Sequence, residues 1–284
     1  MKTSEFKHIR LIQKALHAIH SVMKASDIRE DWPSFKVPEI KYPDRSEEII
    51  FIQKIATLIA AHYRLSNKTF IVNFNSNLDA AARVEISRSD QIFIEYNHTG
   101  QINMVDLWPT MAHEIAHIFL EQIGIRFSET LHNEILTDTA TIYLGFGALY
   151  LSAQRKEITG FSKTHTTYSN KRLGYISPQE MGYVLAHRDF IRGEYSATAI
   201  HSETGSEGYS DGRDLFIEEL SSRPYIKRFW INRFIYKLGW QHKSDMEGIS
   251  FPCLICTQYI RIPALHKTLN VSCPNCKDKI LCYS

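Results

Sequence analysis

The stretch MAHEIAH, residues 111–117, places His113 and His117 four residues apart. On a helix this spacing puts both imidazoles on one face, about one turn apart, where they can bind the same metal ion. Glu114 is rotated by about 100° from His113, so its carboxylate points past such a metal rather than at it. The surrounding residues 104–122 are mostly apolar, which predicts a buried helix. Polar side chains in a buried helix need partners, and a metal ion would supply them.

The chemistry of zinc accounts for this pattern. A zinc ion in a hydrolase is held by three protein ligands and keeps a fourth position for a water molecule, whose pKa it lowers to about 7. We expect His113 and His117 to be two of the three ligands. Glu114 is then placed to accept the proton of that water as a general base.

The third ligand is expected from the next helix, which opens with Asn-Glu-Ile-Leu-Thr-Asp at residues 133–138. Glu134 and Asp138 lie four residues apart and therefore on one face of that helix. Glu134 can bind zinc, while Asp138 can accept the free ring N–H of a ligand histidine and fix its orientation. Asp138 itself, His132 and Glu121 remain alternative third ligands, and a capping or surface role remains the alternative for Glu134.

The combination of HExxH with a following Asn-Glu-x-x-x-Asp resembles the thermolysin-like gluzincins, a family of zinc metallopeptidases. The resemblance covers about residues 104–147 and implies that Glu134 is the third ligand and that Asp138 supports a zinc-binding histidine. The connection between the two motifs is shorter than in thermolysin. The metzincin pattern HExxHxxGxxH does not fit, because Leu120 and Ile123 occupy the positions of its glycine and third histidine.

Three segments before the histidine pair are rich in β-forming residues: Thr69–Phe74, Ala82–Ser87 and Gln91–Asn97. We expect them to form a small antiparallel sheet ahead of a mainly helical metallopeptidase domain, which makes the fold class α+β. The family resemblance implies that an edge strand of such a sheet binds extended substrate. Gln91–Asn97 is our candidate for that strand, with an ordinary internal strand as the alternative.

The chain of 284 residues divides into three predicted parts. Residues 1–45 hold a helix, which we expect to dock on the main domain rather than on a membrane or a partner, followed by an extended Pro-containing connector at 27–46. Residues 46–245 form the metallopeptidase domain, and residues 249–284 form a small zinc ribbon. Because the N-terminus lacks the uninterrupted apolar segment of a signal peptide, we expect a cytoplasmic protein.

Three further features are expected after residue 138. Residues 139–153 are uncharged and predict a buried helix, interrupted at Gly145–Gly147 and too short to span a bilayer. Residues 154–172 are polar and predict a surface loop that borders the cleft. Another helix begins after Ser177, with Pro178 at its first position and Glu180 completing a capping box.

Peptide hydrolysis passes through an oxyanion, which a nearby tyrosine or histidine can stabilise by donating a hydrogen bond. Tyr183 and His187, four residues apart on this last helix, are candidate catalytic donors, and Tyr168 and His201 are further candidates. The alternative is that the tyrosines belong to the core and the histidines to the surface.

The C-terminal segment carries two Cys-x-x-Cys pairs, Cys253 with Cys256 and Cys273 with Cys276, separated by sixteen residues. This spacing is typical of a zinc ribbon, in which four thiolates bind one structural zinc ion. A domain of about 35 residues buries too little apolar surface to fold alone, so the metal would supply the missing free energy. We expect metal-bound thiolates here rather than disulfides.

These patterns predict a cytoplasmic zinc-dependent peptidase that acts on peptides or proteins, with one catalytic and one structural zinc ion and no membrane contact. The ribbon is locally basic, but the net charge of the whole chain is only +2. We therefore expect the ribbon to bind protein or to stabilise the fold, and nucleic acid is a less favoured partner. Two alternatives remain: a DNA-associated or regulatory peptidase targeted by its ribbon, and a non-catalytic zinc-binding regulator. The second has no use for the proton acceptor Glu114.

Overall fold

The computed structural model describes residues 5–23, 25–40, 44, 47–85, 90–97, 103–161, 166–221, 243–245, 248–253, 255–256, 258–263 and 268–283. Its helices are α1 (Ile9–Val22), α2 (Ala25–Asp31), α3 (Glu48–His62), α4 (Met104–Gln122), α5 (Thr130–Thr141), the π-helical η2 (Ile142–Phe146), α6 (Gly147–Ser152), α7 (Pro178–Arg192), the 3₁₀ helix η3 (Ser196–Ala199) and α8 (Glu203–Ser221). Its strands are β1 (Thr69–Phe74), β2 (Ala82–Val84), β3 (Gln91–Tyr96), β4 (Arg155–Phe161), β5 (Thr166–Lys171), β6 (Lys243–Asp245), β7 (Gly248–Pro252), β8 (Tyr259–Pro263), β9 (Thr268–Ser272) and β10 (Lys279–Tyr283). The fold mixes helices with small sheets, as the α+β prediction expects.

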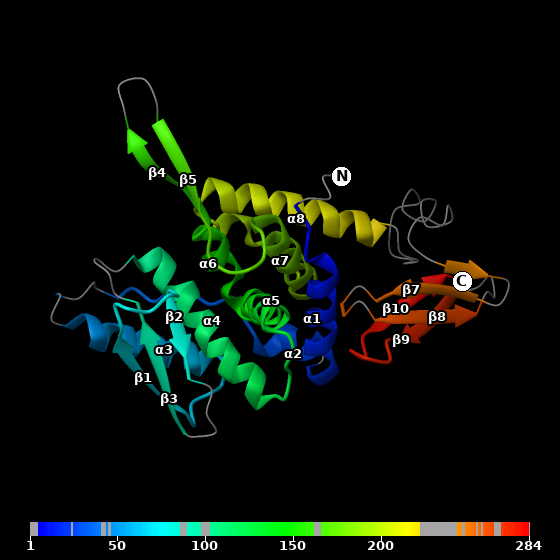
Figure 1. Ribbon diagram of the computed structural model, residues 1–284. Coiled ribbons are helices and arrows are strands. Elements are labelled where there is room, and N and C mark those ends of the chain that lie inside the picture. The colour runs from blue at the N-terminus through cyan, green and yellow to red at the C-terminus, as the bar shows by residue number, and fades with distance from the viewer. Residues whose placement is uncertain are drawn as a thin grey trace.

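Helix α4, which carries the histidine pair, lies between the sheet of β1, β2 and β3 on one side and helices α5 and α6 on the other (Figure 1). Its residues from Leu107 to Ala116 are all buried, because the sheet and α3 cover one side of it and α5 and α6 cover another. The side chain of Asn103 caps the helix by accepting a hydrogen bond of 3.0 Å from the Val105 N–H. The predicted buried helix over residues 104–122 is confirmed.

The sheet beside α4 is mixed rather than antiparallel, and its strand order is β1-β3-β2. The chain reverses between β1 and β2 and again between β2 and β3, so β1 and β3 point the same way, and they pair in parallel. Phe70 pairs with Ile92 and Val72 with Ile94, which gives the two strands one shared buried face. The prediction of an antiparallel sheet is therefore wrong for this pair, although β2 and β3 are antiparallel.

The strand order also corrects the predicted substrate strand. Gln91–Asn97 contains β3, which lies between its two neighbours and has no free edge. The edge strand on the side of α4 is β2. A segment that binds extended peptide needs unpaired backbone N–H and C=O groups, and in this sheet β2 has them on its outer side.

The N-terminal helix α1 docks on the helical part of the molecule, as the sequence predicts. Ile12, Leu16 and Ile19 are almost completely buried, and α1 packs against α5. The connector that follows is not wholly extended, because residues 25–31 form the short helix α2.

The buried segment after α5 is interrupted where the sequence predicts. Gly145 has a φ of +125°, inside the π-helical turn η2 that separates α5 from α6. Its carbonyl accepts a hydrogen bond of 2.9 Å from the Phe35 N–H, which ties the connector to this break. The chain therefore changes direction immediately after the helix that carries Glu134 and Asp138.

Within the predicted loop, residues 155–161 and 166–171 form the antiparallel strand pair of β4 and β5, and Figure 1 shows this hairpin projecting from the molecule. Arg155 pairs with Lys171 at its base. The segment is polar, but it also holds Ile158, Thr166 and Tyr168, whose β-branched or aromatic side chains favour strands. The next helix, α7, begins with the predicted capping box of Ser177 and Glu180.

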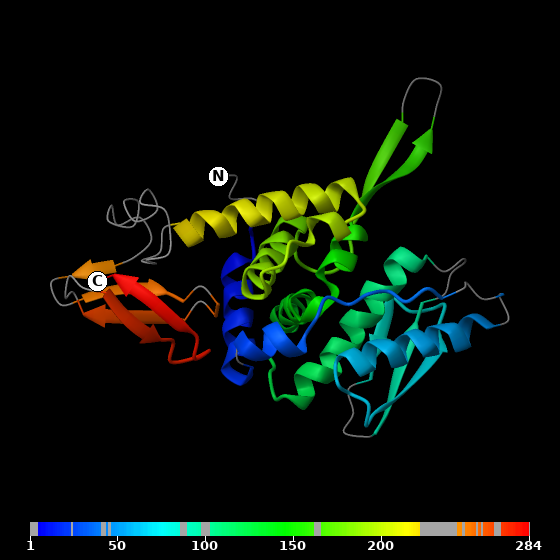
Figure 2. The ribbon, with the colours of Figure 1, turned by 180° about the vertical axis from the view of Figure 1, so that it is seen from behind.

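The C-terminal strands form two separate antiparallel sheets, β6-β7-β8 and β9-β10. Seen from behind in Figure 2, they lie beyond α1, at the opposite end of the molecule from the β1–β3 sheet. The buried apolar residues of both parts belong to one continuous core. Among the described helices, none combines the length and apolar character that crossing a bilayer requires.

Candidate metal centre

Helices α4 and α5 bring three potential metal donors together. One ligand atom each from His113, His117 and Glu134 lies within 4.8 Å of the other two. The Oε2 atom of Glu134 is 3.1 Å from Nε2 of His113 and 3.4 Å from Nε2 of His117. Both histidines thus present the same ring nitrogen to one carboxylate, in an arrangement that a single metal ion would satisfy.

The other ring nitrogen of His113 is held by a buried carboxylate. Asp138 is fully buried, and its Oδ1 lies 2.9 Å from Nδ1 of His113. The Tyr150 hydroxyl donates to the same oxygen over 2.8 Å, and the backbone N–H groups of Tyr175 and Ile176 donate to Oδ2. Asp138 accepts the Nδ1 proton of His113, so that the lone pair of Nε2 is directed at the donor cluster.

His117 is oriented by a threonine that the sequence does not single out. The Thr137 hydroxyl donates its one proton to the Asn133 carbonyl over 2.9 Å. Its oxygen, 3.1 Å from Nδ1 of His117, must therefore accept the proton of that nitrogen. Both histidines are assigned the same tautomer by their hydrogen bonds, with Nε2 free for a metal.

The electrostatics of the cluster favour a positive charge. Burial lowers the pKa of His113, but the hydrogen bonds that its ring donates to Asp138 and Glu134, together with the charges of Asp138 and Glu114, outweigh this effect and raise that pKa to about 10. Burial raises the pKa of Glu134, but the two histidines outweigh this effect and lower it to about 2. The carboxylates around His113 thus stabilise a positive charge at the position where a divalent cation would bind, which fits a metal site.

The described residues exclude the alternative third ligands from this cluster. His132 lies 3.4 Å from Glu129, its neighbour one turn earlier, and neither His132 nor Glu121 belongs to the donor group. Asp138 contacts Nδ1 of His113, on the side of the ring away from the other donors. Glu134 is thus the carboxylate that the structure brings to both histidines.

The donors line a cleft of about 790 Å³, and Glu114 lines it as well. The cleft is also lined by the segment 79–84, which includes the edge strand β2, and by residues 126–128, 130 and 172–175. Tyr175 is half exposed, and its ring stacks on that of His113 with 6.2 Å between centroids. Burial and the nearby carboxylates raise the pKa of Tyr175, so its hydroxyl keeps its proton at neutral pH.

The structure places the other predicted oxyanion donors away from this cleft. Tyr183 and His187 are buried between α7 and α8, where the His187 ring contacts Phe216 with 4.4 Å between centroids. The hydroxyl of Tyr183 accepts a hydrogen bond from Gln13 of α1. Their spacing of four residues therefore reflects core packing, and we correct their assignment as catalytic donors.

The remaining two candidates are also not part of the cleft as described. His201 lines a separate pocket that lies against the opposite face of α4. The side chain of Tyr168 lies outside the described residues. The tyrosines of the cleft, Tyr150 and Tyr175, escape sequence analysis because they belong to α6 and to the segment before α7, which only the fold brings to the histidines.

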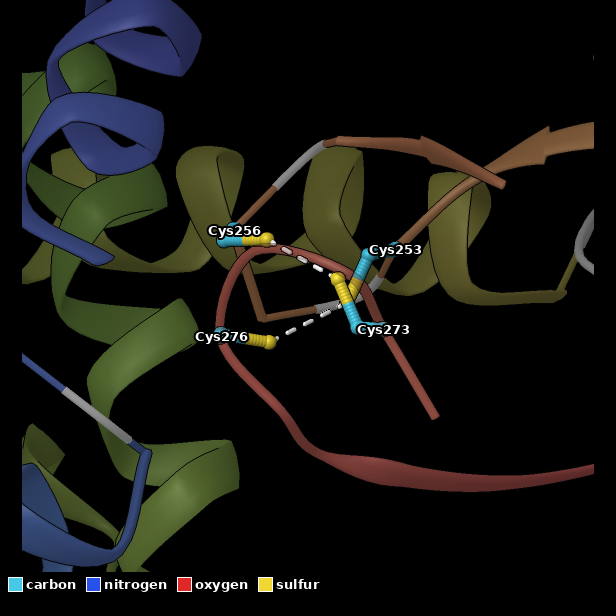
Figure 3. Close-up of side chains that lie close together, drawn as sticks. All are labelled: Cys253, Cys256, Cys273 and Cys276. Atoms are coloured by element: carbon cyan, nitrogen blue, oxygen red, sulfur yellow. Dashed lines mark hydrogen bonds between the residues drawn. The ribbon is translucent and has the colours of Figure 1, made fainter. Parts of the chain in front are cut away.

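A second donor cluster lies in the ribbon. The four sulfur atoms of Cys253, Cys256, Cys273 and Cys276 lie within 4.8 Å of one another and are buried (Figure 3). Two of the separations are 3.7 Å and 3.5 Å, close to the separation of about 3.8 Å that tetrahedral zinc with Zn–S bonds of about 2.3 Å requires. These cysteines are free of disulfides, so the cluster fits a metal ion.

The ribbon contributes its cysteines from the turns of two hairpins. Cys253 and Cys256 lie between β7 and β8, and Cys273 and Cys276 lie between β9 and β10. In each turn the first cysteine donates its N–H to a carbonyl five residues later, at Gln258 and Asp278. The two turns therefore share this hydrogen bond, and each contributes two sulfur atoms to the cluster.

Comparisons with protein families, with curated proteins and with solved structures found no match to this chain. Its interpretation rests on the geometry of the two donor clusters.

Proposed function

We propose that this chain is a zinc-dependent peptidase with one catalytic and one structural zinc ion. The observation that carries the proposal is the convergence of His113, His117 and Glu134 in a cleft that Glu114 and the edge strand β2 also line. Zinc held by the three donors would supply Lewis acidity, which lowers the pKa of a water molecule and polarises a peptide carbonyl.

The proposed mechanism assigns proton transfer to Glu114. Its carboxylate would accept the proton of the attacking water and return it to the nitrogen of the leaving amine. Asp138 and Thr137 would hold the two imidazoles in register throughout. The outer edge of β2 would bind the peptide as an added strand and present its carbonyl to the centre.

Tyr175 is the residue that we propose as the oxyanion donor. It lines the cleft, stacks on His113 and keeps its hydroxyl proton, whereas the Tyr150 hydroxyl is engaged by Asp138. Tyr175→Phe should lower kcat by about 10- to 100-fold with little change in KM. Tyr195→Phe, an exposed tyrosine outside the cleft, serves as the control, and equal kcat values for the two variants would remove Tyr175 from the mechanism.

The structural zinc is proposed for the four cysteines of the ribbon, which would hold it without an open position. Thiolates kept as metal ligands suit a reducing compartment, so we propose the cytoplasm as the site of action and peptides or proteins as substrates.

The test combines metal analysis with a conservative substitution. Wild type should bind about two zinc ions per chain and cleave peptides. Glu114→Gln should keep both ions and lose activity by a factor of about 10² to 10⁴, because the amide cannot accept the proton. Glu121→Gln is the matched control, since Glu121 is an exposed glutamate on the same helix. Cleavage by Glu114→Gln at the wild-type rate would refute the mechanism.

A further inference from the structure

The charged groups that line the cleft do not balance. Asp79 and Arg83 pair with each other over 2.7 Å, Glu134 is one of the three metal donors, and Glu114 lines the cleft beside them. The other charged residues among the described lining are Arg126 and Arg172. A divalent ion would offset the two glutamates, which leaves the two arginines as the excess charge of the cleft.

The two arginines are free to contact a ligand. Both are exposed, and neither takes part in an ion pair of the described residues. Arg172 donates from Nε to the Ile176 carbonyl over 3.4 Å, which anchors the root of its guanidinium and leaves the terminal nitrogens available. Lys14 lies over the ring of Phe127, the neighbour of Arg126, and adds positive charge on that side.

Both arginines come from segments that border the donors. Arg126 lies in the connection between α4, which carries the histidines, and α5, which carries Glu134. Arg172 precedes Tyr175, whose ring stacks on His113. A guanidinium presents paired N–H donors that match a carboxylate in a bidentate geometry.

We propose that Arg126 and Arg172 form a binding subsite for a carboxylate of the substrate. This inference rests on the proposed peptidase function and narrows its substrates to peptides that place a negative charge beside the scissile bond. The carboxylate has two sources: the side chain of an aspartate or glutamate, or the free C-terminus of the peptide.

The experiment uses the zinc-loaded full chain and matched sets of peptides. In the first pair of peptide mixtures both termini are blocked, by acetylation and amidation. One member has glutamate at a fixed position and the other has glutamine there. In the second pair the peptides have no charged side chains. One member has a free C-terminus and the other has an amidated C-terminus. We expect kcat/KM for the acidic member of one pair to exceed its neutral counterpart at least tenfold. The pair that shows the preference identifies the source of the carboxylate.

Substitution connects the preference to these residues. In the double variant Arg126→Gln, Arg172→Gln the ratio between acidic and neutral peptides should fall to near one. In the double variant Arg126→Glu, Arg172→Glu, a mixture with lysine at the fixed position should be cleaved faster than the mixture with glutamate there. Arg213→Gln, an exposed arginine that stacks on Tyr195, is the control and should keep the wild-type ratio.

Binding separates the failure of this inference from that of the peptidase function. The fluorescence anisotropy of labelled peptides with zinc-loaded Glu114→Gln reports the subsite without cleavage. Equal binding and equal cleavage of acidic and neutral peptides would overturn the subsite and leave the peptidase intact. A binding preference without cleavage of any peptide by wild type would support the subsite and refute the peptidase.

Discussion

The two histidines that we propose as metal ligands differ in what holds their Nδ1 atoms. His113 contacts a fully buried carboxylate that also accepts from two backbone N–H groups and a tyrosine, whereas His117 depends on one hydroxyl, that of Thr137. The two ring orientations are therefore fixed with unequal strength. His117 is the ligand that a single mild substitution can loosen.

We predict that Thr137→Val lowers the zinc affinity of the His113 site by about tenfold, because the Nδ1 proton of His117 loses its acceptor. Thr139→Val is a close control, because both threonines are buried on α5 and each donates to the carbonyl four residues earlier. Only the Thr137 hydroxyl also contacts a histidine of the donor cluster. Competition with a chelator measures both affinities. Equal affinities for the two variants would show that the contact with His117 has no role in binding.

The donor side chains could be predicted from the sequence because helical spacing alone aligns them. His113 and His117 share a face of α4, and Glu134 and Asp138 share a face of α5, so only the packing of two helices remained unknown. Thr137, Tyr150 and Tyr175 could not be predicted in the same way. The contact of Thr137 with His117 depends on how closely α5 packs on α4. The contacts of Tyr150 and Tyr175 depend on the π-helical break after α5 and on the path of the chain into α7, and no short sequence pattern encodes either.

Among the elements, the break between α5 and α6 depends on one glycine. A Cβ atom at Gly145 would lie 2.5 Å from the Pro33 carbonyl oxygen and 3.0 Å from Nε2 of His62, in addition to the strain of a φ of +125°. The His62 ring is fixed by a hydrogen bond of 2.8 Å to the Leu144 carbonyl. The neighbours therefore have little freedom to move away.

Gly145→Ala should reduce the free energy of unfolding by about 3 kcal/mol or more, since a clash with backbone adds to the strain of about 1–3 kcal/mol expected at such a φ. Gly193→Ala tests the strain alone: its φ is +68° and nothing lies within 4 Å of the new Cβ. That variant should lose about 1 kcal/mol. Urea unfolding of the zinc-loaded proteins measures both free energies. Similar losses for the two variants would mean that the connector around Pro33 moves away from the new Cβ atom at little cost.

The contact of α1 with η2 makes the docked helix sensitive to acid. His20 is buried, with its Nε2 2.8 Å from the Tyr143 hydroxyl, and burial lowers its pKa from 6.5 to about 4. A histidine whose pKa is lower in the folded state stabilises the fold above pH 6.5. This contribution is lost as the pH falls toward 4.

We predict that the difference in unfolding free energy between wild type and His20→Gln shrinks by about 2 kcal/mol from pH 7 to pH 5. Glutamine can still bond to Tyr143 but does not titrate. Both proteins carry the same metal sites, so acid release of zinc cancels in the comparison. A difference that is constant with pH would show that His20 is accessible to protons in the folded protein.

The elements differ in how far their sequences determine them. Helices α4 and α7 follow from apolar spacing and a capping box, which are local. The pairing of β1 with β3 and the hairpin of β4 with β5 arise from contacts between distant or polar segments, where the local pattern favours an antiparallel meander and a loop. Tyr183 and His187 show the same limit, because helical spacing is equally suited to a core and to a site.

Helix α1 connects the helical part of the molecule to the C-terminal ribbon. On one side this helix packs against α5, and on the other the carbonyl of His17 accepts a hydrogen bond of 3.2 Å from Asn275, which lies between the ribbon's last two metal-site cysteines. The buried residues of the predicted ribbon domain, residues 249–284, pack against the helical core. Loss of the metal should therefore affect more than the ribbon itself.

We predict that Cys273→Ser lowers the zinc content from about two ions per chain to one and increases amide exchange along α1 as well as in the ribbon. A structural zinc supplies about 10–16 kcal/mol of folding free energy, far more than a segment of this size can replace. Without it the turn that carries Asn275 loses its geometry, and α1 loses its outer support. Cys282→Ser is the control, because Cys282 is buried in β10 but lies outside the donor cluster. Exchange in α1 that stays at the wild-type rate after loss of the ribbon zinc would show that residues 249–284 fold and unfold independently of the helical part.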